Sequence, residues 1–416
     1  MNDVDYTKRY CILGAGSSGL PVAKNFRELG IPVDVIERKS EVGGNWHFGT
    51  EGSCICRSTH LISSKRLTAY VDFPMPDDYP LYPSHAQVFD YLKQYAEHFG
   101  LYDVIQFERT VESIERTTDG LWDVRLDGGE TRRYGGVVIA NGHNWDPRWP
   151  DFPGEFHGTV LHASEYKTPD VLAGKRVLVV GAGNSGCDIA VESAMNAAKT
   201  FQSTRRGYNY MPKFVLGVPA DEMAETMLRW HAPLWLRQFT ASLLAKLVLG
   251  WPQDYGLPKP DHRLLESHPI VNSQLLYYVG HGDILVKPNV KCLAGDEVEF
   301  ADGSREAIDV IVYATGYKIT FPFMDAKYLN VRGERPDLFL NAFHPEFDNL
   351  FVAGLIQPDG GQFGLVDWQG KLMAHFVVAQ EQAPAKAERF REQKRDEHRG
   401  FGRRIDYVDS PRHQLE

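Results

Sequence analysis

The sequence predicts an α/β protein with two Rossmann-like dinucleotide-binding domains, because it contains two glycine-rich turns of the same type. The first is Gly14-Ala-Gly16-Ser-Ser18-Gly19 and the second is Gly181-Ala-Gly183-Asn184-Ser185-Gly186. Each follows a short run rich in β-branched residues and opens into a helix-forming stretch. In such a turn the first glycine makes the bend, the second lets the backbone approach a pyrophosphate, and the third lets helix and strand pack closely. Two copies predict two bound dinucleotides, with electrons passing between them.

The residues that follow each turn predict which dinucleotide it binds. After the first turn, a helix to Leu29 and a strand over 33–36 lead to Glu37. An acid about 20 residues past the glycines is where a ribose diol finds its acceptor. After the second turn, the strand over 200–204 ends in Arg205-Arg206, and guanidinium groups suit a phosphate. We therefore expect FAD at the first site and NADPH at the second, with either arginine on the 2′-phosphate; the alternative is two solvated surface charges.

Length and composition exclude several classes of function. With 416 residues, 43% hydrophobic and 24% charged, the chain suits two soluble domains. A net charge of −10 argues against a nucleic-acid or anionic-membrane partner. The five cysteines are scattered except for Cys54 and Cys56, whose spacing fits neither a redox pair nor a zinc site. A reduced, cytoplasmic setting and no bound metal are therefore expected.

The longest apolar run, 234–249, is too short and too interrupted by Arg237, Gln238 and Lys246 to span a bilayer, so no transmembrane segment is expected. Its apolar residues fall at helical spacing, and Gly250-Trp-Pro252 ends it well. We expect a helix that packs on the protein or at a subunit contact, and a homodimer would suit it. Peripheral membrane contact is the alternative.

The order of elements predicts a discontinuous FAD domain over 1–164 and 300–416, with the NADPH domain inserted at 165–299. A capping box at Ser84-His-Ala-Gln87 begins a helix with one apolar face. A hairpin over 122–134 follows. Buried strands end in small residues at 137–142 and 310–316, which we expect to mark where the chain leaves and re-enters the first domain. A long stretch rich in Trp, Leu and Met, about 221–278, predicts a helical insertion in the NADPH domain.

Four further motifs resemble one known family, the class B flavin-dependent monooxygenases, and within it the flavin-containing monooxygenases. The stretch Phe156-His-Gly158-Thr-Val-Leu-His162-Ala-Ser-Glu-Tyr166 matches every fixed position of the family's FxGxxxHxxx(Y/F) fingerprint. The others are Val42-Gly-Gly44-Asn45-Trp46, Ala314-Thr315-Gly316-Tyr317 and the segment 349–358, which includes Gln357. Tyrosine at 166, where the Baeyer–Villiger branch usually has tryptophan, favours the amine- and sulfide-oxidising branch.

The resemblance implies a mechanism in two halves. NADPH reduces FAD by hydride transfer, and O2 then adds to flavin C4a to give a (hydro)peroxyflavin that oxygenates a small nucleophilic nitrogen or sulfur compound. The cofactors carry this chemistry, while the protein positions them and excludes water. Two alternatives stay open: Baeyer–Villiger oxidation of a ketone, and a largely uncoupled NADPH oxidase that releases H2O2.

One departure from the family pattern bears on the oxygen half. The family usually has an asparagine before Ser-Ser-Lys, whereas Ile62 stands there in this chain, and isoleucine offers no hydrogen bond. Donors near the flavin oxygens are needed for the same reason as in an oxyanion hole. Ser63, Ser64 and His60 are the candidate catalytic residues that could replace the amide.

The candidate cofactor-binding residues combine the two turns, the strand ends and the family motifs. Trp46 either stacks beside the flavin or is an ordinary core aromatic. Asp188 is expected to be a structural partner, and His344 an ordinary loop histidine. The full set is Gly14, Gly16, Ser18, Gly19, Glu37, Arg38, Gly44, Asn45, Trp46, Gly181, Gly183, Asn184, Ser185, Gly186, Ser203, Arg205, Arg206, Ala314, Thr315, Gly316 and Gln357.

Overall fold

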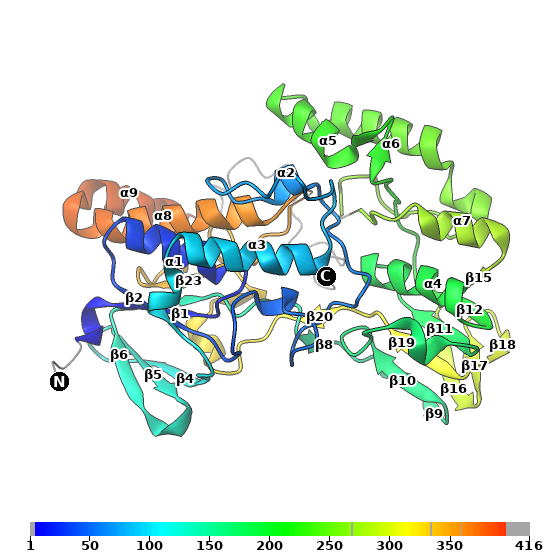
Figure 1. The fold of residues 1–416 in the computed structure, drawn as a ribbon, viewed down its shortest axis with the longest axis horizontal. Coiled ribbons are helices and arrows are strands. Elements are labelled where there is room, and N and C mark those ends of the chain that lie inside the picture. The colour runs from blue at the N-terminus through cyan, green and yellow to red at the C-terminus, as the bar shows by residue number, and fades with distance from the viewer. Residues whose placement is uncertain (1–4, 268, 333–334, 359, 397–416) are drawn as a thin grey trace. The chain divides into compact units, whose positions relative to one another are not determined.

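The computed structural model describes residues 5–267, 269–332, 335–358 and 360–396. These residues form two compact units, each built on a parallel sheet (Figure 1). Within the described residues, the first unit comprises 5–53, 65–143 and 319–396, and the second comprises 54–64 and 144–318. The α/β class with two Rossmann-like sheets is confirmed.

The first unit has a five-stranded parallel sheet in the order β23-β7-β1-β2-β3. Its strands are β1 (Tyr10–Leu13), β2 (Val33–Ile36), β3 (Ile105–Gln106), β7 (Gly136–Ile139) and β23 (Leu350–Val352). The chain moves from β1 to β2 on one side and later places β7 on the other, so the end of β1 is the switch point of this sheet, where dinucleotides bind.

Helices and a small antiparallel sheet complete the first unit. The helices are α1 (Gly19–Glu28), α2 (Lys65–Thr68), α3 (His85–His98), α8 (Phe363–Gln382) and α9 (Pro384–Arg395), and the antiparallel strands are β4 (Val111–Arg116), β5 (Trp122–Leu126) and β6 (Thr131–Tyr134). Short elements are η1 (Tyr6–Lys8), η2 (Gly44–Trp46), η3 (Leu101–Val104), η4 (Asp127–Gly129), η7 (Ala326–Tyr328), β21 (Val331–Arg332) and β22 (Arg335–Pro336). One face of the parallel sheet shares a core with β4–β6, and α8 lies alongside α1 (Figure 1).

Local signals in the first unit are confirmed. Gly30, with φ of +72°, follows α1, where a left-handed residue is expected at a helix end. Ser84 caps α3 and Gln87 bonds back to it, so both halves of the predicted capping box are present. The hairpin predicted over 122–134 is the β5–β6 pair.

The second unit repeats the arrangement, with parallel strands in the order β10-β19-β11-β12-β15. These strands are β10 (Thr159–His162), β11 (Arg176–Val180), β12 (Lys199–Ser203), β15 (Ile284–Lys287) and β19 (Val310–Tyr313). Its helices are α4 (Asn184–Asn196), α5 (Ala220–Arg229), α6 (Leu234–Leu249) and α7 (Gln274–His281). Its remaining elements are β8 (Asp146–Pro147), β9 (Gly154–Phe156), η5 (Pro169–Leu172), β13 (Phe214–Val215), β14 (Val218–Pro219), η6 (Pro252–Tyr255), β16 (Val290–Gly295), β17 (Glu297–Phe300), β18 (Arg305–Ala307) and β20 (Tyr317–Lys318).

The strands 159–162 and 310–313 lie elsewhere than expected from the boundaries 1–164 and 300–416. Both belong to the sheet of the second unit, where β19 pairs with β10 on one side and β11 on the other. The expectation was wrong because β7 and β19 have the same pattern: four buried residues followed by alanine and, two residues later, glycine. Each strand flanks the central strand of its own sheet.

The insertion contains helices, as expected, but several apolar residues of α6 are exposed in the described structure. Phe239, Leu243 and Leu247 are 60%, 44% and 73% exposed, and neither α5 nor α6 has a buried residue. The helix contacts α5, where the Thr240 hydroxyl donates to the Met227 sulfur (3.3 Å), and Leu249 at its end packs against the core of the second unit. Within the described residues, no helix combines the length and the apolar character that crossing a membrane requires.

Candidate nucleotide-binding sites

The first glycine-rich turn joins β1 to α1 in the geometry that a phosphate cradle needs. Gly14 has φ of +103°, and a methyl group on it would lie 2.7 Å from the carbonyl oxygen of Ala140 at the end of β7. A methyl group on Gly19 would overlap the Gly14 carbonyl oxygen. No side chain of the described residues caps α1, so its first N–H groups remain available for an anion.

Glu37 follows β2 and holds this turn directly. Its Oε2 accepts a hydrogen bond from the N–H of Ala15 (2.7 Å), and its Oε1 accepts one from the N–H of Lys39 (2.9 Å). The side chain is buried, and each oxygen of a carboxylate has a second lone pair. Glu37 therefore stiffens the turn and keeps acceptor capacity for hydroxyl groups.

The double-glycine motif packs against the same turn. The N–H of Gly43 donates to the carbonyl of Ala15 (3.0 Å), and a methyl group on Gly44 would lie 3.0 Å from Cα of Gly16. The Lys39 ammonium donates to the Gly44 carbonyl (2.8 Å). The loop between β2 and η2 is thus fixed on the cradle by main-chain contacts.

The neighbouring candidates continue this loop. The carbonyl of Asn45 accepts a hydrogen bond from the Ser53 hydroxyl (2.8 Å). Trp46 is half-buried and meets Phe363, the first residue of α8, edge to face with ring centroids 6.4 Å apart. Arg38 extends toward Gly52, where any added methyl group would overlap its guanidinium.

The segment after β23 reaches the N-terminus of α1. A methyl group on Gly354 would overlap the Ser18 hydroxyl, so glycine is required for this approach. The Gln362 amide donates to the carbonyls of Gly354 and Ile356, both at 2.9 Å. Gln357 lies farther along the segment, with its amide nitrogen 3.4 Å from Nε2 of His143.

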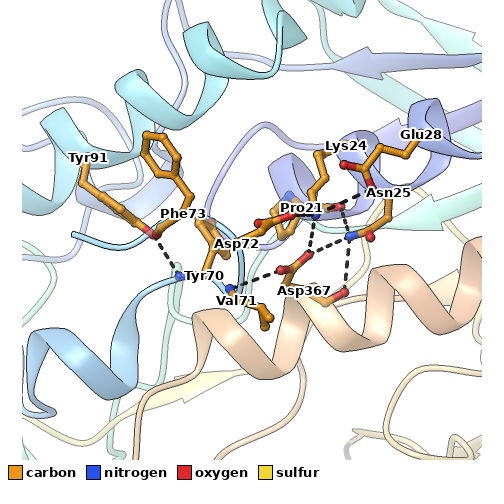
Figure 2. A network of polar contacts seen from close by, with 10 residues as sticks. All are labelled: Pro21, Lys24, Asn25, Glu28, Tyr70, Val71, Asp72, Phe73, Tyr91 and Asp367. Atoms are coloured by element: carbon orange, nitrogen blue, oxygen red, sulfur yellow. Dashed lines mark hydrogen bonds and ion pairs between the residues drawn. The ribbon is translucent and has the colours of Figure 1, made fainter. Parts of the chain in front are cut away.

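A buried polar network joins α1 to α8 and to the segment after α2 (Figure 2). Asp367 of α8 accepts hydrogen bonds from the Asn25 amide (2.7 Å) and the Val71 N–H (3.3 Å), and it pairs with the Lys24 ammonium (3.3 Å). Asp72 binds the same ammonium at 2.5 Å. Lys24 and Asp367 are both buried, 4% and 4% exposed. The helix that carries the first cradle is therefore anchored by a desolvated ion pair.

The second glycine-rich turn joins β11 to α4 with equivalent geometry. Gly181 has φ of +118°, and a methyl group on it would overlap the carbonyl oxygen of Ala314 at the end of β19. A methyl group on Gly186 would lie 2.5 Å from the Gly181 carbonyl oxygen. A methyl group on Gly183 would meet no heavy atom within 4 Å, and among the described side chains none caps α4. The second glycine therefore faces open space at an uncapped helix N-terminus, which fits a pyrophosphate.

The sheet registers show which residues of the two units are equivalent. Leu13 pairs with Ile36 in the first sheet, and Val180 pairs with Ser203 in the second, so Thr204 occupies the position of Glu37. The Thr204 hydroxyl donates to the carbonyl of Arg206 (2.7 Å). No carboxylate stands at this strand end.

Arg205 and Arg206 follow at once. Arg205 is exposed and Arg206 is half-buried. Neither guanidinium has a salt-bridge partner among the described residues. Both guanidinium groups are therefore able to bind an anion.

Other candidates of the second site have structural contacts. The Ser203 hydroxyl donates to the carbonyl of Pro288 (2.7 Å), and Asn184 Oδ1 accepts from the N–H of Val271 (2.9 Å). Ser185 is exposed on the first turn of α4. Asn184 therefore ties the start of α4 to the end of the insertion.

The Ala314-Thr315-Gly316 motif lies at the end of β19, beside the second turn. It thus occupies the place that Ala140 and the two residues after it occupy in the first unit. The Thr315 hydroxyl donates to the carbonyl of Arg148 (2.6 Å), and the N–H of Arg148 donates to the carbonyl of Gly316 (3.0 Å). These bonds close the end of the strand.

The family fingerprint forms part of the core of the second unit. A methyl group on Gly158 would lie 2.5 Å from the carbonyl oxygen of Asp309. His162 is buried, and burial lowers its pKa. The Tyr166 hydroxyl donates to Glu192 of α4 (2.6 Å), and burial, followed by this carboxylate, raises the Tyr166 pKa. The fingerprint thus fixes β10 and the helix of the second cradle.

The candidate catalytic residues lie in the segment 54–64, which belongs to the second unit. Ser63 and Ser64 are buried, whereas His60 is exposed. The Lys213 ammonium donates to the carbonyl of Leu61 (3.2 Å), and Asp221 accepts from the N–H of Ser64 (2.6 Å). Lys213 and Asp221 were not among the sequence candidates, and no local signal distinguishes them because their partners lie more than 150 residues away.

Asp188 of α4 is held as a structural partner, as expected. Its carboxylate accepts from the Asn272 amide (2.6 Å), and Asn272 in turn accepts from the N–H of Leu275 in α7. Desolvation by the surrounding protein atoms raises the Asp188 pKa to about 6, and the Asn272 hydrogen bond and the Lys213 charge oppose that rise. The pair thus joins α4 to α7.

Known proteins resemble this chain over nearly its whole length. The flavin-binding monooxygenase-like family model matches residues 7–410. Flavin-containing monooxygenase 5 of Oryctolagus cuniculus is 33% identical over 435 residues, covering 98% of this chain and 80% of the relative. Dimethylaniline monooxygenase [N-oxide-forming] 2 of Rattus norvegicus is 34% identical over 389 residues, covering 88% and 72%.

A solved structure gives the same fold. The flavin-containing monooxygenase from Stenotrophomonas maltophilia superposes with a TM-score of 0.70 at 20% identity, covering 89% of this chain and 98% of that one. The sequence matches decide the family. This chain therefore belongs to the flavin-binding monooxygenase-like family, whose members are NADPH-dependent oxidoreductases with FAD and NADPH as cofactors.

Proposed function

We propose that the first unit binds FAD, that the second unit binds NADPH, and that the protein oxygenates a small nucleophilic nitrogen or sulfur compound with O2. The contrast between equivalent strand ends carries the assignment of the cofactors: Glu37 follows β2, whereas Thr204, Arg205 and Arg206 follow β12. A carboxylate accepts from a ribose diol, and guanidinium groups bind the extra phosphate of NADPH. When bound, FAD supplies the hydride acceptor and the centre that activates O2.

In the first unit, the chain binds and orients the flavin cofactor. The uncapped N-terminus of α1 offers N–H groups to the pyrophosphate, next to Gly14 and Gly16. Glu37 accepts from the ribose hydroxyls with the lone pairs that its two main-chain bonds leave. Ser18 belongs to the same turn, and the motif that contains Asn45 and Trp46 reaches it through Gly43 and Gly44.

In the second unit, the chain binds the nicotinamide cofactor. The N-terminus of α4 faces the pyrophosphate across Gly183, where there is room for it. Arg205 and Arg206 take the 2′-phosphate, because they have no carboxylate partner in the described part of the chain. A bidentate guanidinium–phosphate contact would give a preference for NADPH over NADH.

The substrate class rests on Tyr166 and on the relatives. Tyrosine at this position favours oxidation of amines and sulfides over ketones within the resembling family. The relative from Rattus norvegicus has N-oxide formation in its name. An amine or sulfide is therefore the first substrate to test, with a cyclic ketone measured beside it to expose Baeyer–Villiger activity.

Anaerobic mixing with NADPH tests the proposal. The flavin absorption of the purified protein should bleach, and readmitted O2 should give a transient blue-shifted flavin spectrum before the oxidised spectrum returns. Product should then form from the amine or sulfide. Folded protein purified without flavin, or flavin that NADPH does not bleach, would contradict the proposal.

Ile62 favours one second candidate, an NADPH oxidase that releases H2O2. Isoleucine cannot donate the hydrogen bond that the family's asparagine supplies. The ratio of H2O2 released to NADPH consumed separates the two functions. A ratio of one with every amine, sulfide and ketone supports the oxidase, whereas a ratio well below one with a good substrate supports the monooxygenase.

A further inference from the structure

A small hairpin at the start of the insertion brings two opposite charges to the same place. Strands β13 and β14 pair Phe214 with Pro219, and the N–H of Ala220 donates to the carbonyl of Lys213 (3.0 Å). The turn residues Leu216 and Gly217 have φ of +51° and +81°, the backbone of a tight two-residue hairpin. Lys213 therefore precedes the hairpin, and Asp221 follows it in the first turn of α5.

Both charged side chains bind the backbone of the segment 61–64. The Lys213 ammonium donates to the Leu61 carbonyl (3.2 Å), and a carboxylate oxygen of Asp221 accepts from the Ser64 N–H (2.6 Å). These are charge-assisted hydrogen bonds, the stronger class. One bond lies on each side of Ile62 and Ser63, so the two together fix the direction of this short stretch.

The backbone groups that accept or donate these two bonds belong to buried residues. Leu61, Ser63 and Ser64 are each less than 9% exposed. Burial lowers the pKa of Lys213, and the carboxylate of Asp188 opposes that shift. The ammonium thus has a countercharge within α4, the helix of the second cradle.

Because the Ile62 side chain has no polar atom, the serine hydroxyls and the backbone N–H groups must supply any donor that this segment presents. Their directions depend on the backbone from Leu61 to Ser64. Ser64 is also the last residue of the second unit before the chain enters the first at Lys65.

We propose that Lys213 and Asp221 are positioning residues for the oxygen half of the reaction, which hold the Ile62–Ser64 backbone so that its donors point in one direction. This inference rests on the proposed monooxygenase function. Without the clamp, reduction of the flavin by NADPH proceeds, but oxygen is released as H2O2 instead of reaching the substrate. The two residues act through the segment and need not touch substrate or cofactor.

The test measures coupling, the oxygenated product formed per NADPH consumed, together with the H2O2 released, in the FAD-loaded full chain with its best amine or sulfide. In Asp221→Ala the ratio of H2O2 to oxygenated product should rise about tenfold, which corresponds to about 1.4 kcal/mol. Asp221→Asn keeps an acceptor oxygen and should restore most of the coupling. Lys213→Met should uncouple, and Lys213→Arg should rescue. The clamp acts on the oxygen half of the reaction only. The rate of anaerobic flavin reduction should therefore stay within about twofold, or about 0.4 kcal/mol, in all four variants.

Lys246→Met is the matched control, because this exposed lysine lies in α6 of the same insertion and contacts the Trp251 ring. It should leave coupling unchanged. A merely structural clamp would lower the melting temperature of the variants without changing the ratio, and that result would overturn the inference. If the alanine and methionine variants do not fold, Asp221→Ser and Lys213→Gln replace each charged hydrogen bond by a shorter, neutral side chain. Both should then uncouple, and wild-type coupling in both folded variants overturns the inference. Failure of NADPH to bleach the wild-type flavin would instead refute the proposed function.

Discussion

A methyl group on Gly183 is expected to weaken NADPH binding while leaving the fold intact. Gly183 has φ of −72° and ψ of 178°, a backbone that alanine adopts freely, and the added carbon would meet no heavy atom within 4 Å. Alanine lowers the entropy of the unfolded chain but is a poorer N-cap than glycine, so the net change in stability should stay within about 1 kcal/mol. The same methyl group would occupy the space that faces the pyrophosphate.

The expected loss of affinity follows from the hydrogen bonds at the start of α4. A hydrogen bond to a charged group contributes about 1.5–3 kcal/mol. If the methyl group displaces the pyrophosphate enough to lose one such bond, the KM for NADPH in flavin reduction should rise about 10- to 100-fold. The FAD content should remain that of the wild type, because Gly183 lies in the second unit.

Two further glycine variants complete the test. Gly16→Ala places its methyl group 3.5 Å from Gly44, an ordinary contact, so it should fold, lose FAD affinity and spare the second site. Gly186→Ala places its methyl group 2.5 Å from the Gly181 carbonyl and should lower stability by about 1–3 kcal/mol. FAD content, thermal unfolding and stopped-flow flavin reduction distinguish these outcomes. The reasoning is refuted if Gly183→Ala lowers FAD content and leaves the KM for NADPH unchanged.

Three other predictions follow from the charges. Replacing Arg205 and Arg206 by alanine should raise the KM for NADPH about 10- to 100-fold and leave that for NADH unchanged in steady-state assays; equal effects on both would contradict phosphate recognition. Lys24→Met leaves Asp367 buried without its cation and should cost about 3–5 kcal/mol in denaturant unfolding, so a wild-type midpoint would contradict the burial argument. Burial, then nearby positive charges, lowers the His344 pKa to about 4. As pH falls from about 6.5 to 4, the unfolded chain therefore takes up a proton at His344 and the folded chain does not, which should lower the free energy of unfolding by about 3 kcal/mol. Denaturant unfolding at pH 7 and pH 4.5 should show a smaller loss of stability in His344→Asn than in the wild type.

The sequence predicted the features that depend on local backbone chemistry. Gly14 and Gly181 adopt left-handed φ angles beside a neighbouring strand, and only glycine fits there. The capping box at Ser84 satisfies two N–H groups within three residues of one another. The contrast between Glu37 and the two arginines could also be predicted, because it depends only on the end of the one strand that follows each turn and its helix. Such features can be predicted from sequence because the residues that determine them lie close together in the chain.

The features that sequence missed depend on contacts between distant parts of the chain. The sequence could not show which of the two sheets contains β19, because β7 and β19 have the same residue pattern. Only the pairing of β19 with β11 places it in the second sheet. Lys213 and Asp221 reach a segment more than 150 residues earlier. Lys24 did carry a signal, since it stands between apolar residues on an otherwise buried helix and therefore needed an anionic partner.

The expectation for the insertion is met only in its local part. The apolar spacing from Leu236 to Leu247 correctly predicted a helix, because periodicity reports local structure. Periodicity does not say what covers the apolar side. Phe239 and Leu247 are exposed in the described structure, so the expectation of a subunit contact at this helix stays a prediction.

The proposed function requires NADPH to reduce FAD by direct hydride transfer, which deuterium in the transferred position of the nicotinamide makes measurable. Anaerobic stopped-flow mixing of the FAD-loaded protein with NADPH labelled at that carbon should bleach the flavin in a single turnover, and more slowly than unlabelled NADPH does. Bleaching at the same rate with both forms would show that another step limits or replaces the transfer. No bleaching at all would contradict the account.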